Sequence, residues 1–173
     1  IGRWTLGAFI GAMRKGVSPD GHHYYPAFPY AAYQNMTLVD VADLFAFIRT
    51  LPRVKGRAPD HDLPFPFNVR RGVGLWKLAF LDAKPLTPDP SKSAEWNRGR
   101  YLVEAAGHCA ECHSPRNLAG AIEPGRRFIG GPNPEGKGTV PNIPPHETGI
   151  GSWSKDEIAE LLFYNDLKDV VLA

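Results

Sequence analysis

The chain has 173 residues, which is enough for one ordinary domain or two small ones. Its 43% apolar and 22% charged residues predict a soluble globular protein and exclude an intrinsically disordered chain. The net charge of +2, with its basic residues scattered, gives no reason to expect a nucleic acid partner, and no apolar run reaches the length of a membrane span. The 18 glycines and 17 prolines predict extensive ordered loops.

Two helices are predicted in the first third of the chain. The first covers residues 4–14 and is capped by Thr5 or a neighbour. The second covers residues 37–51, because a T-x-x-D capping pattern begins at Thr37 and Pro52 stops the helix. Its apolar residues recur on one face, at Val41, Leu44, Phe45, Ile48 and Leu51.

A proline-rich connector follows, from residue 52 to residue 94. It is too apolar to stand free in water, so we expect it to lie against the folded parts, with a short helix near residues 72–81. The apolar residues behind this expectation are Phe65, Phe67, Leu75, Trp76, Leu78, Phe80 and Leu81.

Two further helices are predicted after the connector. One covers residues 95–106 and ends at Gly107, a common residue after a helix. The other runs from residue 154 to about 165 and begins with the capping pair Ser154 and Glu157. No comparable run of alternating strand residues is present, so the expected fold class is all-α.

The chain contains an internal repeat. Residues 1–5, IGRWT, match residues 150–154, IGSWS, at an offset of 149 positions, and Phe9 matches Ile158 at the same offset. We therefore expect the chain to begin and end inside copies of one unit. Because it opens on Ile1 without a signal peptide, we expect it to be processed, truncated or only part of the protein.

The segment CAECH, residues 109–113, holds both cysteines of the chain. Four readings are open: a redox dithiol, half of a zinc site, a disulfide, and an attachment site for a c-type haem. A thioredoxin-like dithiol requires a βαβ context, and a zinc site requires about four ligands. A disulfide that closes so short a loop constrains little of the unfolded chain. C-x-x-C-H is the pattern for covalent haem attachment, with Cys109 and Cys112 reaching the vinyl groups and His113 ligating iron.

Four segments carry a family resemblance. HCAECHSPRN (108–117), RGRYLVEAAGHC (98–109), VPNIPPHETGIGSWS (140–154) and DGHHYYPAFPYAAYQNMT (20–37) together resemble the multi-haem cytochrome c subunits of bacterial periplasmic dehydrogenases, such as those for alcohol, gluconate, fructose or aldehyde. The resemblance covers nearly the whole chain.

The resemblance implies an all-α fold of two class I cytochrome c-like domains joined by the connector, both incomplete in this chain. Residues 1–51 would be the C-terminal part of the first domain, residues 52–94 the connector, and residues 95–173 a second domain without its C-terminal end. With the repeat, it also predicts a second haem in the first domain, with an attachment motif roughly forty residues before Ile1.

The resemblance also implies partners and a location. A flavin-, PQQ- or molybdenum-dependent dehydrogenase subunit would supply electrons, and a quinone, cytochrome or oxidase would accept them. The protein would be exported to the periplasm, with membrane association possible through parts outside this sequence. The chain itself would transfer electrons without catalysis of its own.

The distal ligands of the two irons are less determined. Cytochromes of this class commonly place a Met opposite the His. Relatives often carry this Met where the present chain has Phe28, which leaves Met36 as the candidate ligand for the first haem. His22 and His23 are alternative ligands. Met36 could instead make a hydrophobic contact just before the helix cap. Met13 is expected in the core.

The second iron has three options in the sequence: no sixth ligand, His146, or residues beyond Ala173, and we favour the last because His146 reads as a surface histidine. Arg116 is expected either to pair with a haem propionate or to lie in solvent. Trp4 and Trp153, which are equivalent in the repeat, are expected near the two haem pockets or simply in the core.

Two other function classes compete with electron transfer. One is a haem enzyme of a peroxidase-like or thiosulfate-oxidising dihaem type, in which an iron keeps an open position. The other is a non-haem structural or zinc-binding module. The sequence shows no paired carboxylates, nucleophile constellation or phosphate-binding loop, which favours a relay over a catalyst.

Overall fold

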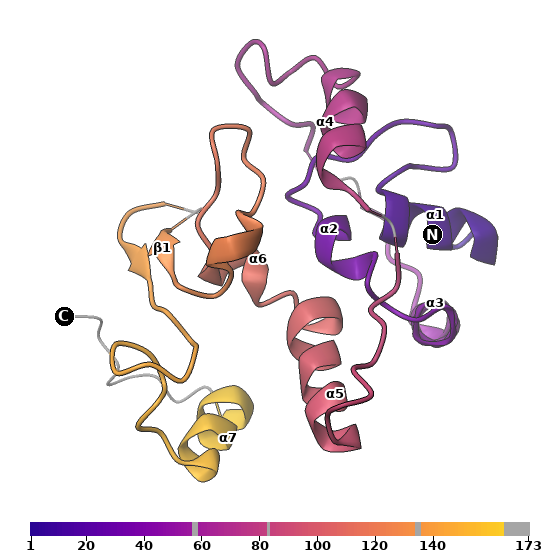
Figure 1. The fold of residues 1–173 in the computed structure, drawn as a ribbon. Coiled ribbons are helices and arrows are strands. Elements are labelled where there is room, and N and C mark those ends of the chain that lie inside the picture. The colour runs from indigo at the N-terminus through magenta and orange to yellow at the C-terminus, as the bar shows by residue number, and fades with distance from the viewer. Residues whose placement is uncertain (57–58, 83, 134–135, 165–173) are drawn as a thin grey trace. The chain divides into compact units, whose positions relative to one another are not determined.

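The computed structural model describes residues 1–56, 59–82, 84–133 and 136–164 as short helices joined by long loops, with one small sheet (Figure 1). The α-helices are α1 (Leu6–Lys15), α2 (Tyr30–Tyr33), α3 (Leu38–Thr50), α4 (Gly72–Phe80), α5 (Ala94–Tyr101), α6 (Ala110–His113) and α7 (Lys155–Tyr164). Leu102–Ala106 forms a π-helical turn, η1, and Pro124–Arg126 a 3₁₀ turn, η2. The antiparallel strands β1 (Gly131–Pro132) and β2 (Thr139–Val140) were not predicted, because two residues per strand leave no alternating pattern.

The two N-terminal helices confirm the capping signals. The N–H of Ala8 donates to Thr5 Oγ1 at the start of α1, and the N–H of Asp40 donates to Thr37 Oγ1 at the start of α3. The prediction that Leu51 belongs to the apolar face of α3 was wrong, because this residue follows the last helical turn and is 49% exposed.

The core lies among α1, α2, α3 and η1. Helix α1 packs against α2 and α3, and α2 packs against η1; α1, α2 and α3 are neighbours in Figure 1. Buried apolar side chains fill the space between them, namely Phe9, Met13, Met36, Val41, Phe45 and Ala105. Met13 is therefore a core residue, as expected.

The connector contributes one docked helix, α4, where a helix was predicted. Its Lys77 is only 7% exposed and its ammonium donates to the carbonyl oxygens of Lys15 and Gly16, at the end of α1. Trp76 donates its indole N–H to the carbonyl of Ala119 at 2.8 Å. The connector therefore contacts folded elements through polar groups.

Several of the apolar side chains behind the expected packing of the connector are exposed, and the packing of the whole connector stays a prediction. Four of them are more than 60% exposed, namely Phe65, Phe67, Leu75 and Leu78. Helix α4 faces its neighbours with Val73 and Lys77 instead.

The repeat is visible in local structure. The N–H of Trp4 donates to Ile1 O at 2.8 Å, and the N–H of Trp153 donates to Ile150 O at 3.1 Å. Ser154 caps α7 by accepting from the N–H of Glu157. Thr5 caps α1 in the same way, by accepting from the N–H of Ala8. The two copies thus fold into the same turn and the same capped helix start.

The chain divides into two compact units that do not coincide with the predicted domains. Unit 1 comprises residues 1–111 and 118–121, and unit 2 comprises residues 112–117 and the chain from 122 onward. Residues 95–111 belong to unit 1 because η1 packs on α2 and joins the core of α1 and α3. The domain boundaries at residues 51 and 94 remain predictions.

Candidate functional site

The CAECH segment is reached through a helix that changes its pitch. Helix α5 is capped by Ser93, whose hydroxyl accepts from the N–H of Trp96, and continues into the wider turn η1. The predicted helix over 95–106 is confirmed in extent, but its last five residues are π-helical. Such turns occur often at functional sites, where they redirect the following side chains.

Two residues with constrained backbones connect η1 to Cys109. A Cβ atom on Gly107 would lie 2.7 Å from the carbonyl oxygen of Leu102 and 3.5 Å from the Cys109 sulfur, so no larger residue fits without displacement. His108 has a φ of 43°, which is uncommon for a residue with a side chain. The N–H of Cys109 donates to Val103 O at 3.1 Å, which fixes the backbone beside the first thiol.

Within the segment, the spacer residues are buried and the chemically active residues are half-buried. Ala110 and Glu111 are 2% and 9% exposed. The thiols of Cys109 and Cys112 and the imidazole of His113 are all partly accessible. The two thiols and the histidine are thus more accessible than the two spacer residues between the cysteines.

A hydrogen bond within unit 2 orients the imidazole of His113. Its Nδ1 lies 2.8 Å from the carbonyl oxygen of Pro141. A carbonyl oxygen only accepts, so Nδ1 carries the hydrogen and Nε2 is the basic nitrogen. A histidine held in this tautomer by a backbone carbonyl is prepared to ligate a metal through Nε2.

The backbone around His113 is fixed as well. The N–H of Gly130 donates to His113 O at 2.9 Å, and the N–H of Phe128 donates to Ser114 Oγ at 3.0 Å. Gly130 has a φ of 76°, and a Cβ there would lie 2.4 Å from Val140 O, so only glycine fits. The segments 128–132 and 139–141, which pair through β1 and β2, thus hold the Pro141 carbonyl against His113.

The donor set fits haem c better than the alternatives. Among the residues that the structure describes, no group of three or more His, Cys, Asp or Glu side chains is arranged to hold a metal ion, as a zinc site around the two cysteines requires. Two thiols and an oriented imidazole within five residues are the protein groups that covalent haem needs.

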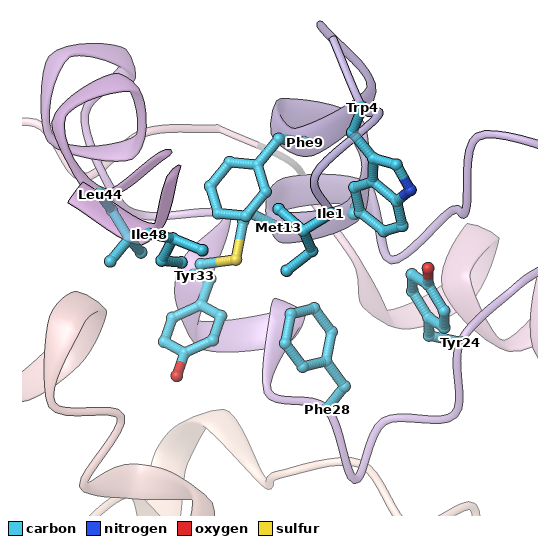
Figure 2. A pocket seen from close by; sticks show the side chains of 10 residues that line it. Ile1, Trp4, Phe9, Met13, Tyr24, Phe28, Tyr33, Leu44 and Ile48 are labelled. Atoms are coloured by element: carbon cyan, nitrogen blue, oxygen red, sulfur yellow. The ribbon is translucent and has the colours of Figure 1, made fainter. Parts of the chain in front are cut away.

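Unit 1 contains an apolar pocket of about 440 Å³ beside α1 and α3 (Figure 2). Its walls are almost entirely carbon, and Figure 2 shows Phe9, Met13 and Tyr33 turned toward its interior. The lining residues are Ile1, Trp4, Phe9, Ala12, Met13, Tyr24, Phe28, Tyr33, Leu44 and Ile48. Its volume and apolar walls are those of a small-molecule or cofactor site.

The candidate ligands for a first haem have different surroundings. Met36 is 7% exposed and belongs to the core cluster rather than to the pocket wall. His22 is exposed and pairs with Asp20 at 3.2 Å. His23 lies 3.2 Å from the Lys77 ammonium, and its pKa is lowered by burial and by that charge. Of the two methionines, Met13 lines the pocket.

The remaining candidates lie in loops of unit 2, apart from Trp4 in the pocket wall. His146 is exposed, and its Nδ1 contacts the hydroxyl and the N–H of Thr148. Arg116 pairs through its backbone with Ile122 and is half-buried. Trp153 is half-buried directly before α7.

Known relatives match nearly the whole chain. A dihaem cytochrome c-type protein of Cereibacter sphaeroides is 48% identical over 162 residues, which covers 94% of this chain and 53% of the relative. The cytochrome subunit of a fructose dehydrogenase from Gluconobacter japonicus is 41% identical over 94% of this chain and 34% of its own length.

This chain is homologous to the cytochrome c subunits of dehydrogenases. A gluconate 2-dehydrogenase cytochrome c subunit of Pantoea cypripedii, 32% identical, extends the same relationship. The chain spans about half or less of the length of these relatives. No known protein-family model matches it. The names of the relatives do not favour the peroxidase-like or thiosulfate-oxidising reading.

Proposed function

We propose that CAECH carries a covalently attached haem c, with thioether bonds to Cys109 and Cys112 and with His113 as the proximal ligand. The observation that carries this proposal is the hydrogen bond from His113 Nδ1 to Pro141 O, because it leaves Nε2 as the ligating nitrogen. When bound, haem supplies a one-electron iron couple. The chain attaches the group, orients its proximal imidazole and surrounds it with fixed loops.

The role of the chain in this proposal is electron transfer. Its relatives are cytochrome subunits of dehydrogenases, so a dehydrogenase subunit dependent on flavin, PQQ or molybdenum is the proposed donor. A quinone, a cytochrome or an oxidase is the proposed acceptor, and the periplasm is the proposed location. No helix among the described residues is long and apolar enough to cross a membrane.

A second haem is proposed in the pocket of unit 1, with its attachment motif outside this sequence. The carbon-lined walls and the volume of about 440 Å³ support this assignment. Met36 is the proposed distal ligand, and Met13, which lines the pocket directly, is its competitor. The distal ligand of the CAECH haem is proposed to lie beyond Ala173, and Arg116 is proposed to pair with a propionate.

Haem staining of denaturing gels tests the attachment. The double variant Cys109→Ala/Cys112→Ala should lower the covalent haem content of the full-length protein by one site, because either thioether bond alone could keep the haem attached. His113→Ala should alter the absorption spectrum and the reduction potential, whereas His146→Ala, a matched change at an exposed histidine, should alter neither. Unchanged staining in the double variant Cys109→Ala/Cys112→Ala would refute the attachment site.

The methionine assignment has its own test. Met36→Leu should abolish the absorption band of a methionine-ligated ferric haem, and Met13→Leu should leave it in place. The reverse result would assign the ligand to Met13.

A further inference from the structure

A chain of aromatic rings runs through unit 1 from the pocket to the residue before Cys109. The ring centroids of Tyr24 and Phe28 are 5.8 Å apart, and those of Phe28 and Tyr33 are 5.7 Å apart. The ring of Tyr33 then lies 5.7 Å from the imidazole of His108. The interplanar angles of 68° to 79° make all three contacts edge-to-face, which is a favourable geometry for paired rings.

Tyr33 is the ring that connects two different sites. It lines the apolar pocket, as Figure 2 shows, and it also contacts His108, which is bonded through the backbone to Cys109. One side chain therefore joins the wall of the pocket to the beginning of the CAECH segment.

Both rings are held by their backbones. The N–H of Tyr33 donates to Pro29 O at 3.0 Å, and its own carbonyl accepts from the N–H of Met36. His108 keeps its left-handed conformation while its carbonyl accepts from the N–H of Glu111 at 2.9 Å. A left-handed backbone at a residue with a side chain is costly, and such strain concentrates at functional positions.

The two elements that carry the rings are also joined. The side-chain amide of Asn35 donates to the carbonyl of Glu104 at 3.3 Å, and α2 packs against η1. This contact keeps Tyr33, on α2, at a fixed distance from His108, which follows η1.

We infer that Tyr33 and His108 form an electronic bridge between the pocket of unit 1 and the haem on Cys109. This inference rests on the proposed function, since it requires a haem at each end. One electron passes from a ferrous iron, which becomes ferric, to a ferric iron, which becomes ferrous. No bond forms or breaks, no proton moves, and the rings are neither oxidised nor reduced. Contacting π systems couple two centres more strongly than an aliphatic gap of the same length.

The test compares electron transfer between the two haems in the intact protein after rapid reduction of one of them. Tyr33→Leu keeps apolar volume and removes the ring, and it should slow the step by about tenfold. His108→Asn, which tolerates the left-handed backbone, should do the same. Tyr33→Phe keeps the ring and should leave the rate within about twofold of the unchanged protein.

Tyr25→Leu serves as the control, because Tyr25 is a tyrosine of unit 1 that contacts His61 instead of the ring chain. It should leave the rate unchanged. The reduction potentials and spectra of both haems should remain the same in Tyr33→Leu, which separates a loss of coupling from a displaced haem. An unchanged rate in Tyr33→Leu would overturn the bridge.

A second variant distinguishes this failure from failure of the proposed function. Trp4→Leu changes the pocket wall and should shift the spectrum or potential of one haem only. If it shifts neither haem, the pocket holds no haem and the proposed function is wrong at that site. If it shifts one haem while Tyr33→Leu has no kinetic effect, only the bridge is wrong.

Discussion

The phenolic hydroxyl of Tyr101 donates a hydrogen bond to the carboxylate of Asp40, and the same hydroxyl oxygen accepts from the N–H of Thr37. Tyr101 ends the helix that leads to CAECH, and Asp40 lies in the first turn of α3. The contact thus links the start of the candidate site to the core of unit 1. The hydrogen bond from Tyr101 lowers the pKa of Asp40, and burial raises the pKa of Tyr101.

Removing this hydroxyl should weaken unit 1 in a pH-dependent way. Tyr101→Phe should lower the free energy of unfolding by about 1 kcal/mol at pH 7, as expected for a partly exposed hydrogen bond to a carboxylate. Because the folded-state pKa of Asp40 is lowered, its contribution is present above the unfolded value and is lost as pH falls through the folded one. Urea unfolding should show that the difference in free energy of unfolding between Tyr101→Phe and the unchanged protein is smaller in acid than at pH 7.

Tyr24→Phe is the matched control for that experiment, since it removes a tyrosine hydroxyl elsewhere in unit 1. A difference between Tyr101→Phe and the unchanged protein that stays constant with pH would contradict the role of Asp40.

Lys77 should make the free energy of unfolding depend on pH in the alkaline range. Burial lowers the pKa of Lys77 to about 8, so this group releases its proton in the folded protein well before it does in the unfolded chain. Between about pH 8 and pH 10.4 the unfolded state binds more protons, so this group's contribution makes the free energy of unfolding rise with pH. Lys77→Met should lack this rise, whereas Lys84→Met, at an exposed lysine, should retain it. Parallel pH profiles for Lys77→Met and the unchanged protein would contradict the assignment.

Gly107 should be essential for presenting the first thiol. Gly107→Ala places a Cβ 2.7 Å from Leu102 O, and the displacement should cost about 1–3 kcal/mol and reduce haem attachment at Cys109. Gly99→Ala is the matched control in α5, where a Cβ meets no atom within 4 Å, and it should leave the stability unchanged or raise it by up to about 1 kcal/mol. Haem content per polypeptide and urea midpoints measure both effects, and equal behaviour of the two variants would contradict the steric argument.

Two side-chain truncations test which face of α4 packs against the rest of unit 1. Val73→Ala should cost about 1–2 kcal/mol, because Val73 is 9% exposed and loses buried carbon. Leu78→Ala should change stability by no more than about 0.5 kcal/mol, because Leu78 is 84% exposed. Denaturant unfolding would contradict the orientation of α4 if Leu78→Ala proved the more damaging change.

The sequence predicted the helices that carry local signals. Thr5, Thr37 and Ser154 each cap the helix expected of them, since a cap is determined by residues three positions apart. The short turn α2 was missed because four residues do not establish a helical period. The exposed face of α4 was missed because docking through a buried lysine leaves no trace in an apolar pattern.

The candidate site was predictable only where its chemistry is contiguous. Cys109, Cys112 and His113 are recognised from spacing alone. The carbonyl of Pro141 lies 28 residues from His113, and any residue supplies a carbonyl, so no sequence signal marks it. Tyr33 and His108 were missed for a similar reason, because their contact depends on how α2 packs against η1.

The mass of the tryptic peptide over residues 101–116 shows whether CAECH holds a covalent haem. We expect a peptide heavier by one haem, with both cysteines blocked to alkylation in the native full-length protein. A peptide with two alkylatable thiols, or one joined only by a disulfide, would contradict it.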